Sequence, residues 1–304
     1  MCDGVRDDLV KYMRVRRSDV MRSKKPPVED GAENRVVIGR PEDDEGFEPP
    51  ALMVAEQNEM VWQKERFFSV GLKYLKTRHK HLLWLDADLI FFHTDWLSQL
   101  KAKLAHSHLV QLFNRVEDVR LEDGRPVPTG LVRKSAIECW QSGQISVEEY
   151  FDNSGISLSL GCNPGLAWGA KVETVRRVGF ADFMLLGSGD KLLLASAMGQ
   201  HVKFASTLGL NRCLHERSQR WGQKVFGQIQ GKVSYLDNIV YHVAQGIYSK
   251  RNYSSRYRLI DDDRFELGAY LETNRYGAWQ WKDDDDDDND FARVIERYFR
   301  ERGD

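Results

Sequence analysis

The chain has 304 residues, of which 41% are hydrophobic and 30% are charged, and its formal net charge is −2. This length suffices for one large α/β domain or two small ones, and the composition is ordinary for a globular protein. Because the net charge is close to zero, bulk charge gives no argument for a nucleic-acid partner, although a local basic groove would be hidden in the average.

The N-terminal sequence and the cysteines bear on where the protein is found. Residues 1–7 lack the apolar core of a secretory signal, and no segment approaches the roughly 20 apolar residues that a transmembrane helix needs. The four cysteines follow no zinc-binding spacing and read as free thiols of a reducing compartment: Cys2, Cys139, Cys162 and Cys213. We therefore expect a cytoplasmic or otherwise intracellular protein without a signal peptide or membrane span.

The first part of the chain is charged and weakly patterned. Residues 1–34 are predicted to be a poorly ordered or helical N-terminal segment, with residues 8–17 as the candidate helix. Short strands are predicted at 35–38 and 51–55. Apolar residues at helical spacing predict an amphipathic helix over 61–75.

The most informative stretch is an apolar run that ends in two carboxylates. Residues 82–85 are short and continuously apolar, as expected for a buried parallel strand, and Asp86 and Asp88 follow them. In an extended chain, residues i and i+2 point to the same side, so both carboxylates face one spot at the carboxyl end of the strand. Open α/β sheets bind ligands there. Two converging carboxylates need a compensating charge, which a divalent cation such as manganese or magnesium supplies.

After Asp88 the pattern predicts alternating helices and strands around a long polar insertion at residues 114–160. Helices are expected at 95–104, 135–141, 172–178 and 187–198. Strands are expected at 109–113, 165–170, 202–204 and 233–235. This alternation predicts an α/β fold with a mixed, mostly parallel sheet flanked by helices.

The C-terminal part contains a run of six aspartates at residues 283–288. Such a charge run is typical of a solvated linker. We therefore predict that residues 35–270 form the folded domain and that residues 271–304 form a polar tail.

Six motifs, in order between residue 62 and about residue 259, give the chain a family resemblance. They are residues 61–65, 84–88, 110–113, 163–168, 187–190 and 241–256. Together they resemble a family of largely uncharacterised bacterial and viral glycosyltransferase-like proteins with the GT-A fold. The resemblance implies a metal-dependent enzyme that moves a hexosyl group from a nucleoside diphosphate sugar, with uridine as the expected nucleoside, to a hydroxyl acceptor.

The resemblance also implies roles for the acidic residues and one histidine. Asp86 and Asp88, with His242 as the third ligand, would hold the divalent cation that stabilises charge on the departing diphosphate. Asp190, at the start of a helix after a glycine-rich turn, is the candidate general base for the acceptor hydroxyl. The alternatives are a helix cap for Asp190 and a satisfied structural histidine for His242.

Basic residues supply the candidate contacts to the donor phosphates. We assign them to Lys64, Lys250 and Arg251, because ammonium and guanidinium groups pair with phosphate oxygens. Lys250 and Arg251 belong to a basic cluster that continues to Arg256 and Arg258. A solvated, exposed surface is the alternative for all of them.

The acceptor side is assigned to a turn, an aromatic residue and a glycine. Acceptor contacts are expected from Asn163, Gly165, Trp168 and Gly189. An ordinary tight turn is the alternative for Asn163 and Gly165, and a core position is the alternative for Trp168. The acceptor class stays open among glycan, lipid, protein and modified DNA base.

Two departures from the family pattern leave other functions open. The family shows His-Gly near residues 245–246, where this chain has Gln-Gly, and the first strand of a GT-A domain has no candidate in residues 1–30. A catalytically inactive sugar-nucleotide-binding or scaffold domain is therefore one rival. A glucosyltransferase acting on hydroxymethylated DNA bases, of the base J type, is another. A metal-dependent nucleotidyltransferase or phosphohydrolase is a third.

Overall fold

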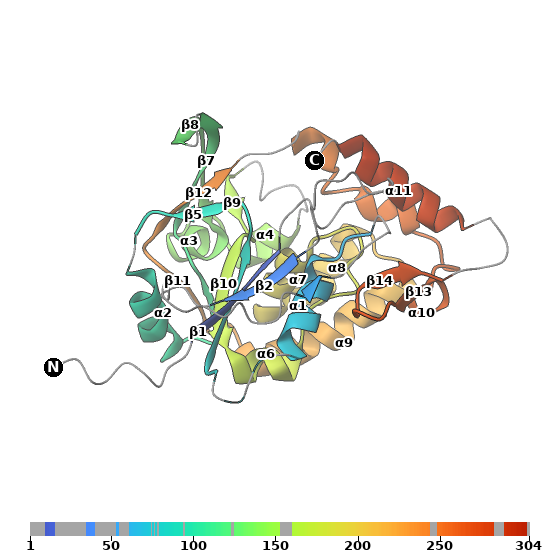
Figure 1. Cartoon of the computed structure of the whole chain (residues 1–304), viewed down its shortest axis with the longest axis horizontal. Helices are drawn as coiled ribbons and strands as arrows, with labels where there is room; N and C mark the ends of the chain where they lie inside the picture. The colour runs from blue at the N-terminus through green and yellow to red at the C-terminus, as the bar shows by residue number, and fades with distance from the viewer. Residues whose placement is uncertain are drawn as a thin grey trace.

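Strand β4 (His81–Asp86), which contains the apolar run before Asp86, is the middle strand of a seven-stranded sheet in a computed structural model (Figure 1). The structure describes the backbone of residues 10–15, 35–39 and 53–54, and then residues 61–302 except 74, 76, 78, 94, 123–124, 153–159, 244–247 and 283–288. The strand order is β11-β6-β10-β4-β1-β2-β3. The other six strands are β1 (Val10–Val15), β2 (Arg35–Gly39), β3 (Met53–Val54), β6 (Leu109–Gln111), β10 (Ala167–Lys171) and β11 (Val233–Tyr235).

The strand directions correct one part of the predicted fold class. The chain is α/β with mixed sheets, as expected. Among the described strands of the seven-stranded sheet, however, only the pairs β11–β6 and β4–β1 are parallel, while β6–β10, β10–β4, β1–β2 and β2–β3 are antiparallel. The expectation of a mostly parallel sheet is therefore wrong, because chain reversals beside β10 and β2 were not visible in the hydrophobic pattern.

Strand β1 corrects the prediction for the N-terminal segment. It pairs in parallel with β4, with Val15 opposite Asp86, and in antiparallel fashion with β2. The candidate helix over residues 8–17 and the absence of a first strand are both wrong. Lys11 and Arg14 interrupt the apolar run by which strands are recognised. The other residues of the 1–34 segment lie outside the described part of the chain.

Helices cover both faces of the sheet, as the alternation of side chains along β4 shows. Leu82 and Trp84 belong to one buried cluster, and Leu83 and Leu85 belong to another. Helix α2 (Trp96–Leu104) contributes Leu100 and Leu104 to the second cluster. The first, larger cluster is built by helices α1 (Lys64–Lys73), α6 (Val172–Val178), α7 (Gly189–Ala197), α8 (His201–Leu208) and α9 (Arg212–Ile229).

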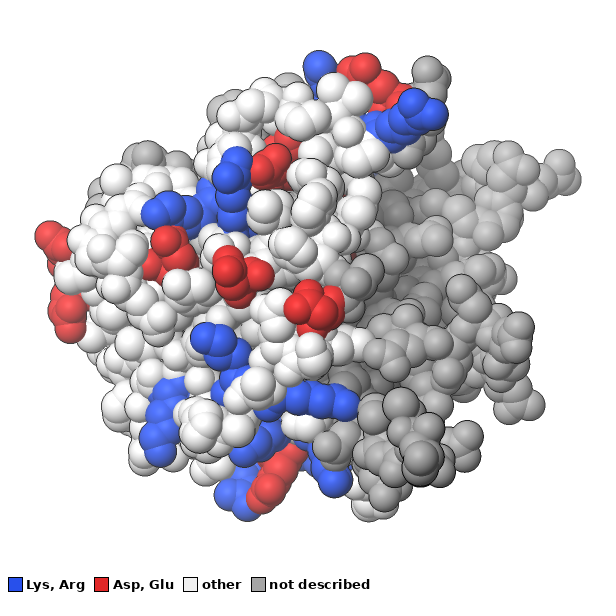
Figure 2. Space-filling view, turned by 90° about the vertical axis from the view of Figure 1, so that its left-hand side faces the viewer, with Lys and Arg blue, Asp and Glu red and all other residues white. Residues whose placement is uncertain are grey.

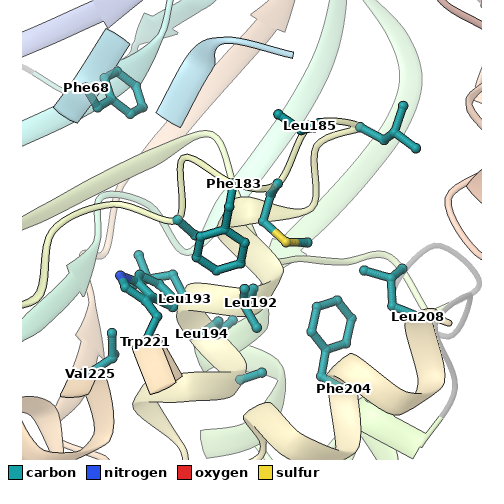
Figure 3. Close-up of a cluster of buried hydrophobic side chains, with 14 of the residues drawn as sticks. Phe68, Phe183, Leu185, Leu192, Leu193, Leu194, Phe204, Leu208, Trp221 and Val225 are labelled. Atoms are coloured by element: carbon teal, nitrogen blue, oxygen red, sulfur yellow. The ribbon is translucent and has the colours of Figure 1, made fainter. Parts of the chain in front are cut away.

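Figure 3 shows the part of the larger cluster where α7, α8 and α9 meet. The labelled side chains Leu192, Phe204 and Trp221 come from these three helices and lie around Phe183. Residues 202–204 were predicted to be a strand, and this is wrong. Phe204 and Leu208, which are four residues apart, are buried on α8, whereas Val202 is exposed. This spacing indicates a helix, but it can be recognised only in a window longer than the three residues of the predicted strand.

The long polar insertion contains regular structure that belongs to a second, five-stranded sheet. The strand order of this sheet is β5-β12-β7-β8-β9. Figure 1 shows the β7–β8 hairpin projecting at the top of the view. The strands are β5 (Leu89–Phe91), β12 (Ile239–Val243), β7 (Arg115–Glu122), β8 (Arg125–Ser135) and β9 (Cys162–Asn163). The short helix predicted in this region is α3 (Ala136–Gln141), and α4 (Val147–Asp152) follows it.

The C-terminal region is folded where the structure describes it, so the predicted polar tail is wrong there. Helix α11 (Asp290–Arg302) buries Phe291, Ile295 and Phe299 at a spacing of four residues. Residues 283–288, the predicted linker, lie outside the described residues. The remaining elements are the 3-10 helices η2 (Tyr248–Arg251) and η3 (Arg256–Ile260), helix α10 (Leu267–Tyr270) and the hairpin of β13 (Leu271–Thr273) and β14 (Trp279–Trp281). Among the described helices, none has the length and apolar character to span a bilayer.

Candidate functional site

A pocket opens where β4 ends, and it contains most of the residues singled out in the sequence. Its space is about 1230 Å³, counted out to the solvent at its mouth. Eight of the candidate residues line it: Lys64, Asp86, Asp88, Asn163, Gly165, Asp190, His242 and Arg251. The structure therefore brings together side chains that lie up to 187 residues apart in the sequence (251 − 64 = 187).

Strand pairing explains why Asp88 and His242 meet. The chain turns sharply after Asp86 and enters β5, which pairs with β12 so that Leu89 lies opposite His242. The amide of Val243 donates to the Asp88 carbonyl at 2.9 Å, which fixes the register. Nε2 of His242 consequently lies 3.5 Å from Oδ2 of Asp88, and both side chains are almost fully buried.

A second carboxylate, which the sequence reading missed, holds the other side of the imidazole. In the parallel pairing of β12 with β7, His242 lies opposite Asp118, and its Nδ1 is 2.9 Å from Oδ1 of Asp118. Arg133, from β8, also pairs with Asp118. Burial alone would lower the pKa of His242, but its hydrogen bonds with Asp118 and Asp88 and their charges outweigh burial and raise it. The protonated imidazole is thus stabilised in the free protein.

Lys64 links the end of β4 to the start of α7. Its Nζ lies 2.7 Å from Oδ1 of Asp86 and 2.7 Å from Oδ2 of Asp190, and the lysine itself is 7% exposed. Burial would lower the pKa of this ammonium, but the charges of Asp190 and Asp86 raise it overall. Burial also raises the pKa of Asp86 to about 6, although Lys64 opposes this shift. The lysine is therefore a fixed cation between two carboxylates.

Glu65 packs behind this pair and away from the pocket. Its Oε2 accepts a 2.6 Å hydrogen bond from the indole N–H of Trp62, and burial raises its pKa to about 7. Gly189 lies directly against it, because a Cβ at Gly189 would be 2.1 Å from Oε1 and 2.7 Å from Cγ of Glu65. Gly189 thus allows α7 to approach α1 closely, and it does not line the pocket, where we expected an acceptor contact.

The turn before β10 is shaped to admit the Asp190 side chain. Oδ1 of Asn163 accepts from the Gly165 amide at 2.8 Å, and the buried Gln111 amide donates to the Asn163 and Gly165 carbonyls at 2.8 and 3.3 Å. A Cβ at Gly165 would be 2.8 Å from Oδ2 of Asp190. Gly165 is therefore required for the position of Asp190, whether or not it also contacts a ligand.

Two residues that border the pocket adopt a left-handed backbone. Leu166 has φ of 78° and Ser188 has φ of 77°. This conformation is strained for any residue with a side chain and often marks functional sites. The Leu166 carbonyl accepts from the Asp86 amide at 2.8 Å, so the strained turn is tied to the end of β4.

Two further candidates lie elsewhere. Trp168 is fully buried in the sheet core, opposite Trp84 on β4 and Gln111 on β6, which is the alternative that we had left open for it. Lys250 is exposed on η2 and does not line the pocket. The Gln-Gly stretch at residues 245–246 lies outside the described residues.

Several pocket residues were missed in the sequence. Besides Arg133, they are Trp62, Ser188, Lys191, Tyr253 and Arg302, whereas Arg256 was noted only as part of the basic cluster. Asp118, which contacts His242 but does not line the pocket, was missed as well. Burial lowers the pKa of Lys191 to about 8. For Arg302 a signal did exist, because it continues the buried stripe of α11. For Asp118 there was none, since its role depends on a strand partner 124 residues away.

The donor chemistry at Asp88 and His242 fits a divalent cation of the manganese class. A histidine that donates its Nδ1 proton to a carboxylate keeps Nε2 as a ligand atom, which is a common arrangement at metal sites. Asp86 pairs with Lys64 and would have to exchange this partner to join the shell. Among the described residues, no group of three or more His, Cys, Asp or Glu side chains is arranged around one point.

Comparison with known proteins does not identify the chain. No protein-family model matches its sequence, and no curated protein matches it either. The function is therefore argued from the pocket and its charges.

Proposed function

We propose that this protein is a metal-dependent glycosyltransferase with a GT-A-like fold, which transfers a sugar from a nucleoside diphosphate sugar, uridine-linked by preference, to a hydroxyl acceptor. The observation that carries the proposal is the position of Asp86, Asp88, Asp190 and His242 around one pocket at the end of the central strand. Ligands bind at this edge in α/β sheets. Strand β1, parallel to β4, supports the GT-A-like arrangement further.

In this proposal the metal shell would be formed by Asp88 and His242, with Asp86 as the third ligand. A bound manganese or magnesium ion would act as a Lewis acid for the diphosphate leaving group. Asp118 orients the imidazole through Nδ1, and Arg133 keeps Asp118 ionised beside it. Burial would raise the pKa of Asp118, but the His242 hydrogen bond and the Arg133 charge lower it overall.

Asp190 would bind and deprotonate the acceptor. Its carboxylate lines the pocket and lies 2.7 Å from the ammonium of Lys64, and a carboxylate is the group that a general base requires here. As the acceptor oxygen forms its bond to the anomeric carbon, its proton passes to Asp190 and the bond from that carbon to the diphosphate oxygen breaks. With retention of configuration Asp190 would bind the acceptor instead of acting as the base.

The experiment is a screen of nucleoside diphosphate sugars with manganese, scored by release of the nucleoside diphosphate and by mass spectrometry of the products. Asp88→Asn and Asp190→Asn should each lose at least about a hundredfold in rate. Asp95→Asn, which changes an exposed carboxylate at the start of α2, serves as the matched control. Turnover that is equal in all four proteins, or absent with every common donor, contradicts the proposal. Transfer of the nucleotide instead of the sugar would favour the nucleotidyltransferase alternative.

The structure gives the DNA-modifying alternative no added support. The basic cluster of Lys250, Arg251, Arg256 and Arg258 could have pointed to a polyanionic partner, but Arg251 and Arg256 are buried in the pocket wall. On the face shown in Figure 2, charged side chains of both signs are scattered over a mostly uncharged surface, and most of the basic ones lie in its lower part. An inactive sugar-nucleotide-binding domain remains the alternative that the turnover assay separates from an enzyme.

A further inference from the structure

Three arginines line one side of the pocket, and all come from the C-terminal part of the chain. Arg251 ends η2, Arg256 begins η3 and Arg302 ends α11. They are only 4%, 3% and 2% exposed, respectively. A guanidinium group stays charged at any physiological pH, and burying it is costly unless an anion or a set of acceptors compensates.

Only for Arg256 do the contacts show a charge without compensation, because its partners in the described structure are neutral. One of its terminal nitrogens donates to the Ser188 hydroxyl, and its guanidinium lies 4.9 Å from the centre of the Tyr253 ring. Its Nε is buried without a hydrogen-bond partner, and no carboxylate of the described residues lies within ion-pair distance of it. A hydroxyl and a ring face orient the side chain but leave its charge uncompensated.

The other two arginines are held in place by aromatic residues. Nη1 of Arg251 donates to the Tyr253 hydroxyl at 3.0 Å, and the Tyr298 hydroxyl donates to the Arg251 carbonyl at 2.7 Å. The Arg302 guanidinium lies 5.8 Å from the centre of the Trp62 ring and 5.5 Å from that of Phe299. Helix α11 therefore carries Arg302 into the pocket wall in a fixed orientation, as a preorganised binding site requires.

We propose that Arg251, Arg256 and Arg302 form a subsite that binds a phosphoryl group, mono- or diphosphate, of the ligand that enters this pocket. Guanidinium forks match phosphate oxygens in geometry, and three of them suit a multiply charged anion better than a single carboxylate. The choice of a phosphoryl anion rests on the proposed function. The subsite itself rests on the uncompensated charge of Arg256 and on the place of all three arginines in the pocket lining.

Binding of inorganic pyrophosphate to the full chain, measured by calorimetry without divalent metal at constant ionic strength, tests this subsite. Arg256→Gln should weaken binding by about tenfold or more. Arg256→Lys, which keeps a positive charge but loses the fork, should show a smaller loss and guards against misfolding of the first variant. Arg258→Gln, an exposed position on the same 3-10 helix, should bind like the unchanged protein. No binding by the unchanged protein, or equal binding by Arg256→Gln and Arg258→Gln, overturns the subsite.

A competition arm identifies the source of the phosphoryl group. If uridine diphosphate displaces pyrophosphate, the subsite holds the donor diphosphate, and if both bind together, it holds a phosphoryl group of the acceptor. Either result supports the subsite, since each requires Arg256. The outcomes also separate the two proposals. If pyrophosphate binding depends on Arg256 but no sugar is transferred, the subsite is supported and the proposed enzymatic function is contradicted. If sugar is transferred but Arg256→Gln binds pyrophosphate as well as the unchanged protein does, the function is supported and the subsite is contradicted.

Discussion

Nδ1 of His242 lies 2.9 Å from Oδ1 of Asp118, a contact set by the parallel pairing of β12 with β7. The carboxylate fixes the ring so that Nε2 faces Asp88. A carboxylate behind a ligating histidine usually changes metal affinity by about 10- to 100-fold. We therefore predict that Asp118→Asn weakens manganese binding by about that factor, as measured by electron paramagnetic resonance of the free ion. Unchanged affinity would show that His242 is not a ligand.

A second prediction concerns Lys64, whose ammonium separates Asp86 from Asp190. Lys64→Met leaves two carboxylates facing each other without a cation, so the free energy of unfolding should fall by about 2 to 4 kcal/mol. The lower end applies because both carboxylates remain partly exposed. Manganese should restore part of the loss, because the ion would then compensate the same charges. Urea denaturation with and without the metal measures both effects. Equal responses of Lys64→Met and the unchanged protein to manganese would contradict the second part.

A third prediction follows from the pKa of Glu65, which burial raises to about 7 from 4.5. A carboxyl group with a raised pKa stabilises the fold fully below its unfolded value, and this stability is lost as the pH rises through the folded value. The loss for Glu65 should reach about 3 kcal/mol above pH 7. Glu65→Gln, which cannot ionise, should lack this term. The stability difference between the two proteins should therefore change between pH 5 and pH 8 in urea denaturation, and a constant difference would be the contrary result.

A fourth prediction compares two glycines in helices. Gly189→Ala places a Cβ against buried Glu65 and should lower the free energy of unfolding by about 1 to 3 kcal/mol. Gly227 lies exposed inside α9 with nothing within 4 Å of an added Cβ. Gly227→Ala should therefore raise stability by about 0.5 to 1 kcal/mol, because alanine favours helix. Thermal melts of both variants give the sign of each effect, and a neutral Gly189→Ala would mean that α1 and α7 can move apart.

The central strand and its two acids were predictable because their signal is local. Residues 82–85 form an unbroken apolar run, and Asp86 and Asp88 follow it two residues apart. This spacing places both carboxylates on one side of the chain whichever strands lie beside it. Strand β1 was not predictable in this way. Lys11 and Arg14 hide it, and its position beside β4 depends on pairing across 71 residues (81 − 10 = 71).

The residues that contact these two acids and His242 could not be predicted either, because their positions also depend on contacts between distant parts of the chain. Asp118 lies in a strand whose sequence reads as polar, and only its register with β12 gives it a role. Lys64 was singled out as a phosphate ligand, but its contacts are the two carboxylates. Arg302 could have been found from the spacing of Phe291, Ile295 and Phe299, but the neighbouring aspartate run favoured a polar tail.

Of the four residues other than glycine that have a positive φ in the described structure, Leu166 and Ser188 border the pocket. Each such conformation costs roughly 1 kcal/mol or more compared with glycine. Glycine at these two positions would relieve that cost, but it would also remove the packing of Leu166 on the second buried cluster and the Ser188 hydroxyl that accepts from Arg256. A gain in melting temperature would therefore be accompanied by a more flexible rim of the pocket. Thermal stability and turnover are expected to oppose each other at these two turns.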